Sequence, residues 1–303
     1  MESLFFTYIN SNNSTQIEKI RQECLDLASK GAFNFDDCDD ILTLSHESPR
    51  ALNEAIHLIL SKQTVLSSLT VSDIYCKPME TITKAAANIE GTFSNGKIYI
   101  ALSIEPLGEL TSIQKYELIN STGEPFPGEH FESWEAALHC TLNEAPLTDS
   151  PLTNVKINLT HFKVTDPKSK LNRHDYFSAC RQLLRKALKA AGIQLAEPII
   201  RVNLKLQSIF ISTVYQVAST SRAIVLEEED LTEDVTKLIL EVPAFSMNSF
   251  EQQLAIYTDH YNLSAELMEH RVSGDPFEEG SYAADLVKSE RRQKRLPGDL
   301  PNL

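Results

Sequence analysis

The sequence predicts an α+β protein in which two split βαβ domains flank a β-rich domain. Strand-like and helix-like segments alternate in the order of split βαβ units over the first 79 residues and again after residue 197. Between these regions, β-branched and aromatic runs predominate. A chain of 303 residues is long enough for two or three domains that each bury a core. We expect domains at 1–79, 80–197 and 198–275, followed by a mobile, charged tail at 276–303.

The first domain has the pattern of a small ferredoxin-like layer, with two helices on an antiparallel sheet. Residues 2–9 alternate loosely as in a strand, and NSTQIEKIRQECLDLASKG then places apolar residues at helical spacing before Gly31. DDILTLSH predicts a short strand, after which Ser48 caps a helix that has Pro49 at its first position. With the extended TVSDIY that follows, this order is that of a split βαβ unit.

The middle and last domains follow from the same kinds of pattern. Strands are predicted near 81–91 and 97–105 and in YELINS and NVKINLTHFKV, and HFESWEAALHCTLNEA and DYFSACRQLLRKALKAAG predict two amphipathic helices. After residue 197 the order is β, α, β, β, α, which is again that of a ferredoxin-like domain. The five segments are IIRVNLKL, SIFISTVYQVAS, RAIVLEEED, KLILEVPA and SFEQQLAIYTDH.

The segment EGTFSNGKIYI begins like a phosphate-binding loop of the form G-x-x-x-x-G-K-[ST]. Gly91, Gly96 and Lys97 fit that form, but Ile98 stands where the motif needs a hydroxyl. A β-branched, aromatic run follows instead of a helix. Asn95-Gly96 is also the commonest signal for a two-residue type I′ turn. We therefore predict a β-hairpin here and no nucleotide site.

The charge of the chain is unevenly distributed. A net charge of −14 argues against a nucleic-acid partner for the chain as a whole. Between Lys156 and Lys189, however, nine lysines and arginines stand against two aspartates, which gives this segment a charge of +7. Its loop cations could bind RNA phosphates together with Lys97 of the hairpin, or they could form a solvated charged loop. The candidates are Lys163, Lys168, Lys170, Arg173 and His174.

Cysteine catalysis and metal binding find little support in the sequence. Five scattered cysteines without a C-x-x-C pair favour reduced thiols in an intracellular compartment. A histidine–aspartate pair precedes Cys180, but a helix cap and a buried thiol explain these residues better than a nucleophile does. His130, His139 and Cys140 lack the spacing of a zinc site. Trp134 is expected in the core, and we expect no catalytic or metal-binding residue.

The sequence has the pattern of neither a membrane span nor a leader. No apolar run approaches the roughly 20 residues of a transmembrane helix. The opening MESLFFTYIN lacks the basic n-region of a secretory signal and the arginine-rich pattern of an organelle presequence. We expect either a cytosolic protein or a chain that begins inside a longer one.

Six segments carry a resemblance to a known family through their order and spacing. FFTYI, DDILTLSHESPRALNEAIHLIL and IYCKPMETI come first, followed by GTFSNGKIYIALSIEPL, which ends in a Glu-Pro pair. LAEPIIRVNLKL and LEVPAFSMNSF come last. Over about residues 3–275, these segments resemble the third, fourth and fifth domains of elongation factor G and its relatives, the translational GTPases.

The chain departs from the family pattern at several places. The third domain's Gly-Met-Gly-Glu-Leu-His turn is Ser45–Arg50 here, and the Gly-rich tip of the fourth domain keeps only Gly91 and Gly96. The fifth domain's Arg-Ser-x-Thr-x-Gly segment is replaced by LAIYTDHYN. The family's GTP-binding domain and its following β-barrel are absent from this sequence. Such divergence fits a specialised or organellar paralogue, such as a mitochondrial ribosome-recycling factor, better than a general translocase.

The resemblance implies the ribosome-binding part of a translational GTPase that acts in ribosome recycling or translocation, in the mitochondrial matrix or alternatively the cytoplasm. It implies a monomer that contacts ribosomal RNA, ribosomal proteins and a ribosome recycling factor, and no membrane. GTP and Mg²⁺ would belong to the missing domain, so this chain would hold no cofactor. The tip that enters the ribosome would comprise Asn95, Gly96, Lys97, Lys163, Lys168, Lys170, Arg173 and His174.

Two other functions remain open at this point. One is a non-enzymatic scaffold of ferredoxin-like domains that binds protein alone, which cosedimentation with ribosomes would distinguish. The other is an NTP-dependent enzyme that uses the segment from Gly91 to Lys97.

Overall fold

The computed structural model is an α+β protein, as the sequence predicts. The described residues contain seven α-helices and three sheets. No helix in this described part is long and apolar enough to cross a membrane. The structure describes residues 5–11, 14–38, 41–46, 49–62, 69–71, 75–108, 110, 115–123, 128–165, 171–258 and 260–300.

The chain divides into two compact units, each built from two stretches of sequence. Unit 1 comprises Met1–Lys77 with Pro198–Glu269, and unit 2 comprises Pro78–Glu197 with His270–Leu303. Two long strands contribute residues to both units. These strands are β11 (Ile193–Gln207) and β14 (Tyr261–Val272).

The first half of unit 1 is a sheet with two helices. The strand order is β2-β3-β1-β4, β5 also pairs with β1, and the pairs of β1 with β3, β4 and β5 are antiparallel. Ile9, Leu42 and Leu52 are fully buried in its core. The edge strand β2 is mostly polar, which is why apolar periodicity did not predict it. The elements are β1 (Phe5–Ser11), α1 (Ser14–Ser29), β2 (Asn34–Cys38), β3 (Ile41–His46), α2 (Pro49–Ser61), β4 (Leu69–Val71) and β5 (Tyr75–Cys76).

The second half of unit 1 repeats this topology. Its strand order is β12-β13-β11-β14, which matches the first half strand for strand. The last strand adds one element to the predicted βαββα order, and its residues Tyr261, Leu263, Ala265 and Leu267 alternate onto the core. The other elements are η1 (Ser208–Phe210), α5 (Ile211–Thr220), β12 (Ile224–Asp230), β13 (Val235–Pro243) and α6 (Ala244–Tyr257).

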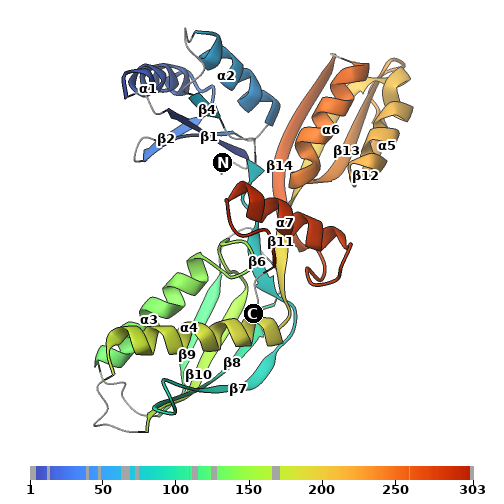
Figure 1. The fold of residues 1–303 in the computed structure, drawn as a ribbon. Helices are drawn as coiled ribbons and strands as arrows, with labels where there is room; N and C mark the ends of the chain where they lie inside the picture. The colour runs from blue at the N-terminus through green and yellow to red at the C-terminus, as the bar shows by residue number, and fades with distance from the viewer. Residues whose placement is uncertain are drawn as a thin grey trace. The chain divides into compact units, whose positions relative to one another are not determined.

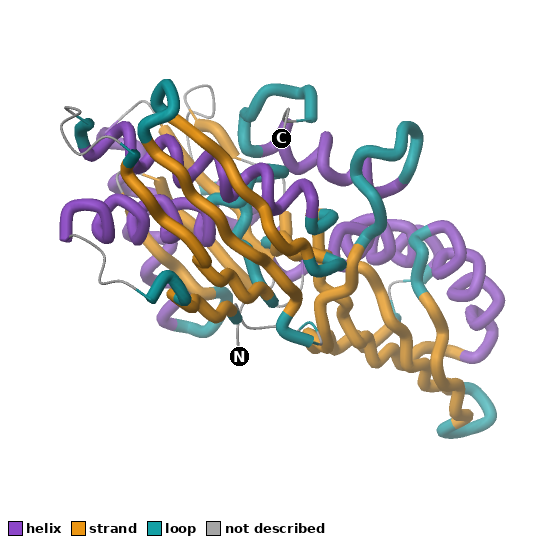
Figure 2. Tube along the Cα trace, turned by 90° about the horizontal axis from the view of Figure 1, so that it is seen from below, coloured by secondary structure: helices purple, strands orange, loops and turns teal. Residues whose placement is uncertain are grey.

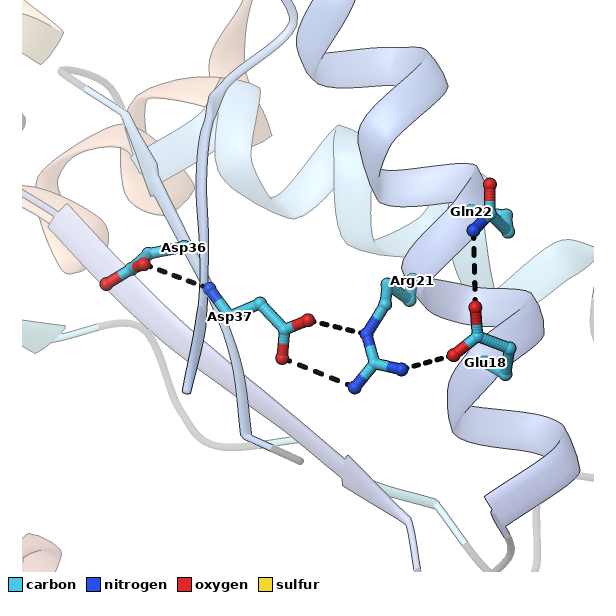
Figure 3. A network of polar contacts seen from close by, with 5 residues as sticks. All are labelled: Glu18, Arg21, Gln22, Asp36 and Asp37. Atoms are coloured by element: carbon cyan, nitrogen blue, oxygen red, sulfur yellow. Dashed lines mark hydrogen bonds and ion pairs between the residues drawn. The ribbon is translucent and has the colours of Figure 1, made fainter. Parts of the chain in front are cut away.

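Ion pairs join a helix to the edge strand in the first half of unit 1. Figure 3 shows Arg21 of α1 between Glu18 of the same helix and Asp37 of β2. Gln22 donates to Glu18 at 3.2 Å, and the hydrogen bonds from Gln22 and Arg21 lower the pKa of Glu18. Because these side chains are in contact with solvent, we expect their contribution to stability to be small and sensitive to salt.

Unit 2 is built around a four-stranded sheet with helices on one face. The strand order is β7-β8-β10-β9, in which β9 and β10 are parallel and the other pairs are antiparallel. Figure 1 shows α3 and α4 in front of these strands. Figure 2, which is a view from below, shows layers of helices (purple) against strands (orange). Ile98, Ile100, Leu102 and Ile104 are buried at alternate positions along β8. The elements are β6 (Met79–Ile82), β7 (Ala86–Phe93), β8 (Ile98–Pro106), β9 (Tyr116–Asn120), α3 (Gly128–Asn143), β10 (Val155–Val164) and α4 (Arg173–Ala190).

Part of the segment expected to be a mobile tail, 276–303, is folded in the described residues. Residues Tyr282–Gln293 form α7, which begins at a Ser281 cap and buries Ala283, Ala284, Leu286 and Val287. The Arg291 guanidinium donates to the Leu147 carbonyl at 2.6 Å, so the end of the helix is bound to another part of unit 2. The abundance of charged residues hid a narrow apolar stripe, and that stripe is sufficient to dock the helix.

Candidate nucleic-acid interface

The turn between β7 and β8 is a hairpin, as the sequence predicts, but its loop is longer than two residues. Four residues, 94–97, separate β7 from β8, and the Lys97 N–H donates to the Phe93 carbonyl at 3.0 Å. Ser94, Asn95 and Gly96 have φ angles of +51°, +58° and +87°. Asn95 and Gly96 therefore have the left-handed backbone that the motif predicts. The type I′ assignment is wrong because Ser94 adopts this conformation as well.

The structure does not support a phosphate-binding loop at this turn. Ile98, which follows Lys97, is fully buried and begins a strand, so the loop does not lead into a helix as a phosphate-binding loop does. Gly91 lies against an aromatic ring, since a Cβ atom there would be 2.5 Å from the Cζ atom of Phe93 and would displace the ring. The glycines that resemble a nucleotide motif thus serve a turn and a close contact.

The end of β10 is hydrogen-bonded to this hairpin. Lys163 stands opposite Tyr99 in the register of β10 and β8. One residue past the strand, the Thr165 N–H donates to the Lys97 carbonyl at 2.9 Å and the Thr165 hydroxyl donates to the Gly96 carbonyl at 2.6 Å. Lys97 and the exposed Lys163 therefore lie at the same end of the sheet, as predicted.

Of the remaining predicted residues, Arg173 and His174 lie at the start of α4. Lys168 and Lys170 fall outside the described residues. The helix itself begins with a capping box, in which the Asp175 N–H donates to the Asn172 side chain at 3.0 Å and the Asn172 N–H donates to Asp175 at 2.9 Å. This explains Asp175 without any catalytic role. It also fixes the two residues between them, Arg173 and His174, on the first turn.

Arg173 and His174 lie next to α3. Arg173 forms an ion pair with Glu132 of α3 at 3.0 Å, and both side chains are well exposed. Together with Ser133, Ala136, His174 and Phe177, these two residues line an open groove of about 260 Å³. The pair offsets part of the positive charge, so Arg173 is a weaker candidate for phosphate binding than Lys163.

The structure also disfavours a cysteine nucleophile in this region. Cys180 is fully buried, and burial raises its pKa to about 12, so the thiolate that a nucleophile needs does not form near neutral pH. Trp134 is 6% exposed and belongs to the core, as predicted. Among the described residues, no group of three or more His, Cys, Asp or Glu side chains is arranged to hold a metal ion.

A buried polar network around Glu80 was missed by the sequence analysis. The Glu80 carboxylate is fully buried and accepts hydrogen bonds from the N–H groups of Leu147 at 2.9 Å and Thr148 at 2.7 Å. Burial raises the pKa of Glu80 to about 7, although these donors act in the opposite direction. Lys294, the C-cap residue of α7, donates to the Thr148 carbonyl at 2.8 Å and to the Ser150 hydroxyl at 2.7 Å.

The Glu80 network holds the loop after α3 rather than a ligand. Its members are separated by more than 60 residues along the chain, from Glu80 to Thr148 and on to Lys294. The only local signal is a glutamate inside the apolar strand METI, which sequence periodicity treats as an exposed position. A network of this kind depends on tertiary packing and was not predictable from spacing.

A scan of the chain against protein-family models finds no match.

Proposed function

We propose that this chain is the ribosome-binding part of a translational GTPase similar to elongation factor G. In this proposal, unit 2 is an arm whose basic end enters the ribosome, and no residue of the chain is a chemical catalyst. GTP hydrolysis would belong to a domain outside this sequence. The process would be ribosome recycling or translocation in mitochondria, with a ribosome recycling factor as a further partner in the first case.

The observation that carries the proposal is the hydrogen-bonded end of unit 2. Thr165 binds the carbonyls of Gly96 and Lys97, so the hairpin and the end of β10 form one surface that includes Lys97 and Lys163. The loop that continues from Thr165 holds further cations in its sequence. Positive charge fixed by backbone bonds suits contact with RNA phosphates, which give affinity without reading sequence.

The repeated topology in unit 1 supports the same proposal. Both halves have the strand order 2-3-1-4 when strands are numbered within each half, and both have a helix after the first and the third strand. This is the arrangement expected of ferredoxin-like split βαβ domains. The resemblance to the third and fifth domains of the family requires two such domains around a middle domain.

Cosedimentation with purified mitochondrial and bacterial ribosomes tests the proposal. We expect binding that weakens with salt and that weakens further in the variant Lys97→Gln, Lys163→Gln, which removes two charges at the hairpin end. A matched variant, Lys19→Gln, Lys30→Gln, removes two charges from unit 1, one within α1 and one directly after it. This variant should bind like the parent. If the parent chain does not sediment with ribosomes at low salt, the proposal is wrong and a protein-binding scaffold becomes the better explanation.

A further inference from the structure

Helix α4 carries a row of cations that lies outside the predicted tip. Arg181, Arg185 and Lys189 follow each other at intervals of four residues and therefore share one side of the helix. With a rise of 1.5 Å per residue, neighbouring members are about 6 Å apart along the axis and the row spans about 12 Å. We name these three residues the α4 row.

The α4 row is accessible and its two arginines are not neutralised within the described structure. Arg185 and Lys189 are exposed and Arg181 is half-buried. In the part of the chain that the structure describes, Arg181 and Arg185 have no hydrogen bond or ion pair from their side chains. By contrast, the neighbouring Lys186 is occupied, because its ammonium donates to the Glu90 carbonyl at 2.8 Å.

The opposite side of α4 fixes the row in place. Leu183, Leu184, Ala187 and Leu188 are all fully buried against the rest of unit 2. The helix cannot turn about its axis without exposing these side chains to water, which is unfavourable for each leucine. The cations are therefore held on the solvent side by the packing of the helix.

The charge of the two helices differs in sign. Between Arg173 and Ala190, α4 holds five lysines and arginines and one aspartate, while α3 holds three glutamates and no lysine or arginine. Stability does not require several cations at this spacing on one helix, since like charges spaced four residues apart are slightly destabilising. A row of this kind is better suited to a polymer of regularly spaced anions than to a single anion.

We propose that the α4 row is a second binding surface for the phosphate backbone of RNA. It extends contact from the hairpin end of unit 2 along the side of α4. The inference rests on the proposed function for the identity of the RNA as ribosomal, but the surface itself needs only a nucleic-acid backbone. Binding should be independent of RNA sequence, since no aromatic or amide side chain for base recognition is part of the row.

The test compares three charge variants of the full chain. The row variant is Arg181→Gln, Arg185→Gln, Lys189→Gln, and the tip variant is Lys97→Gln, Lys163→Gln. The control is Lys288→Gln, Arg292→Gln, Arg295→Gln, which removes three charges on or next to α7 in the same unit. Each variant is titrated with a 20-base-pair RNA duplex and with purified ribosomes over a salt series, and circular dichroism verifies its folding.

We expect the row variant to bind the RNA duplex at least tenfold more weakly than the parent at low salt. The slope of log K against log salt should fall by roughly 0.7–0.9 for each lost contact, or about two to three units in total. The control variant should match the parent. The variant Arg181→Lys, Arg185→Lys keeps the charge and should restore most of the affinity, which excludes an indirect effect on folding.

The results separate this inference from the proposed function. If the tip variant weakens ribosome binding and the row variant binds both probes like the parent, the inference is wrong and the proposed function stands. If the row variant weakens binding to the duplex while the parent does not bind ribosomes, the surface is confirmed and the proposed function is wrong. If the row and control variants lost affinity to the same extent, the effect would depend only on the net charge of the protein, and the inference would be wrong.

Discussion

Replacing Glu290 of α7 by glutamine should stabilise unit 2 above neutral pH. The Glu290 side chain is 1% exposed, and neither of its carboxyl oxygens has a hydrogen-bond partner. Burial raises its pKa to about 7 from the ordinary value of 4.5, while Lys294, one turn further along the chain, acts weakly in the opposite direction. A buried carboxylate without a partner is unfavourable, so the docked helix favours the protonated form.

The sign and size of the effect follow from this shift. Below about pH 4.5 the group is protonated in both the folded and the unfolded chain and has no effect on their balance. As the pH rises towards 7, the unfolded chain releases the proton while the folded chain retains it, so stability falls over this window. The shift of about 2.5 pKa units corresponds to a loss of roughly 3 kcal/mol once the pH is above 7.

Urea unfolding followed by tryptophan fluorescence measures this effect. Trp134 is the only tryptophan in the sequence and is buried in α3, so its signal reports on unit 2. Glu290→Gln should exceed the stability of the parent by less than about 1 kcal/mol at pH 5 and by roughly 3 kcal/mol at pH 8. Glu80 and His270 also titrate, but both proteins contain them, so their effects cancel in the comparison.

Two further variants make the result interpretable. Glu290→Met fills a similar volume without a polar group and should show the same gain at pH 8, because it also removes the buried charge. Glu279→Gln changes an exposed glutamate that precedes the same helix and should leave the pH profile of the parent unchanged. If the gain of Glu290→Gln were equal at pH 5 and pH 8, the carboxyl group would not be held protonated and the reasoning would be refuted.

Three other outcomes follow from the described contacts. Glu80→Gln should destabilise unit 2 by roughly 1–3 kcal/mol in the same urea assay, because an amide would place a donor against a backbone N–H group; an unchanged midpoint would contradict this. Thr165→Val removes the hydrogen bond to the Gly96 carbonyl, so we expect faster amide exchange in the hairpin loop and a loss of about 1 kcal/mol in the stability of unit 2. Unchanged exchange would show that the backbone bond from Thr165 to Lys97 is enough to hold the loop. Arg21→Ala should lower the stability of unit 1 by less than about 1 kcal/mol in thermal unfolding, and this difference from the parent should shrink in high salt. If high salt left the difference unchanged, the ion pair with Asp37 would not be its cause.

Apolar periodicity was sufficient to predict the elements with a strong pattern. The strand at Ile98–Pro106 and the helices α3 and α4 were predicted because their buried residues recur at the spacing of a strand or a helix. The signal failed where charge dominated the composition. In α7 the docked face is narrow, and the residues around it are charged, so the segment was interpreted as a mobile tail.

The candidate site was predictable to the extent that it depends on adjacent strands. The hairpin before β8 and the end of β10 must meet because those strands pair, and Thr165 then binds the hairpin directly. The partner of Arg173 depends instead on how two helices pack on the same sheet face. Such contacts between helices cannot be derived from the spacing of residues along either one, so the weakening of Arg173 as a candidate came only from the structure.

The difference in charge between α3 and α4 has a consequence for how a polyanion would approach unit 2. The glutamates of α3 repel phosphates, and the ion pair between Glu132 and Arg173 marks the border between the two helices at their first turns. An RNA strand that follows the α4 row would therefore be displaced from α3 towards the side where Lys186 binds the Glu90 carbonyl. Removing Glu132 and Glu135 should relax this preference and increase affinity for the RNA duplex, with a steeper dependence on salt because Arg173 becomes available for phosphate contact. Loss of affinity in that variant would mean that α3 contributes to binding and that charge does not set the direction of approach.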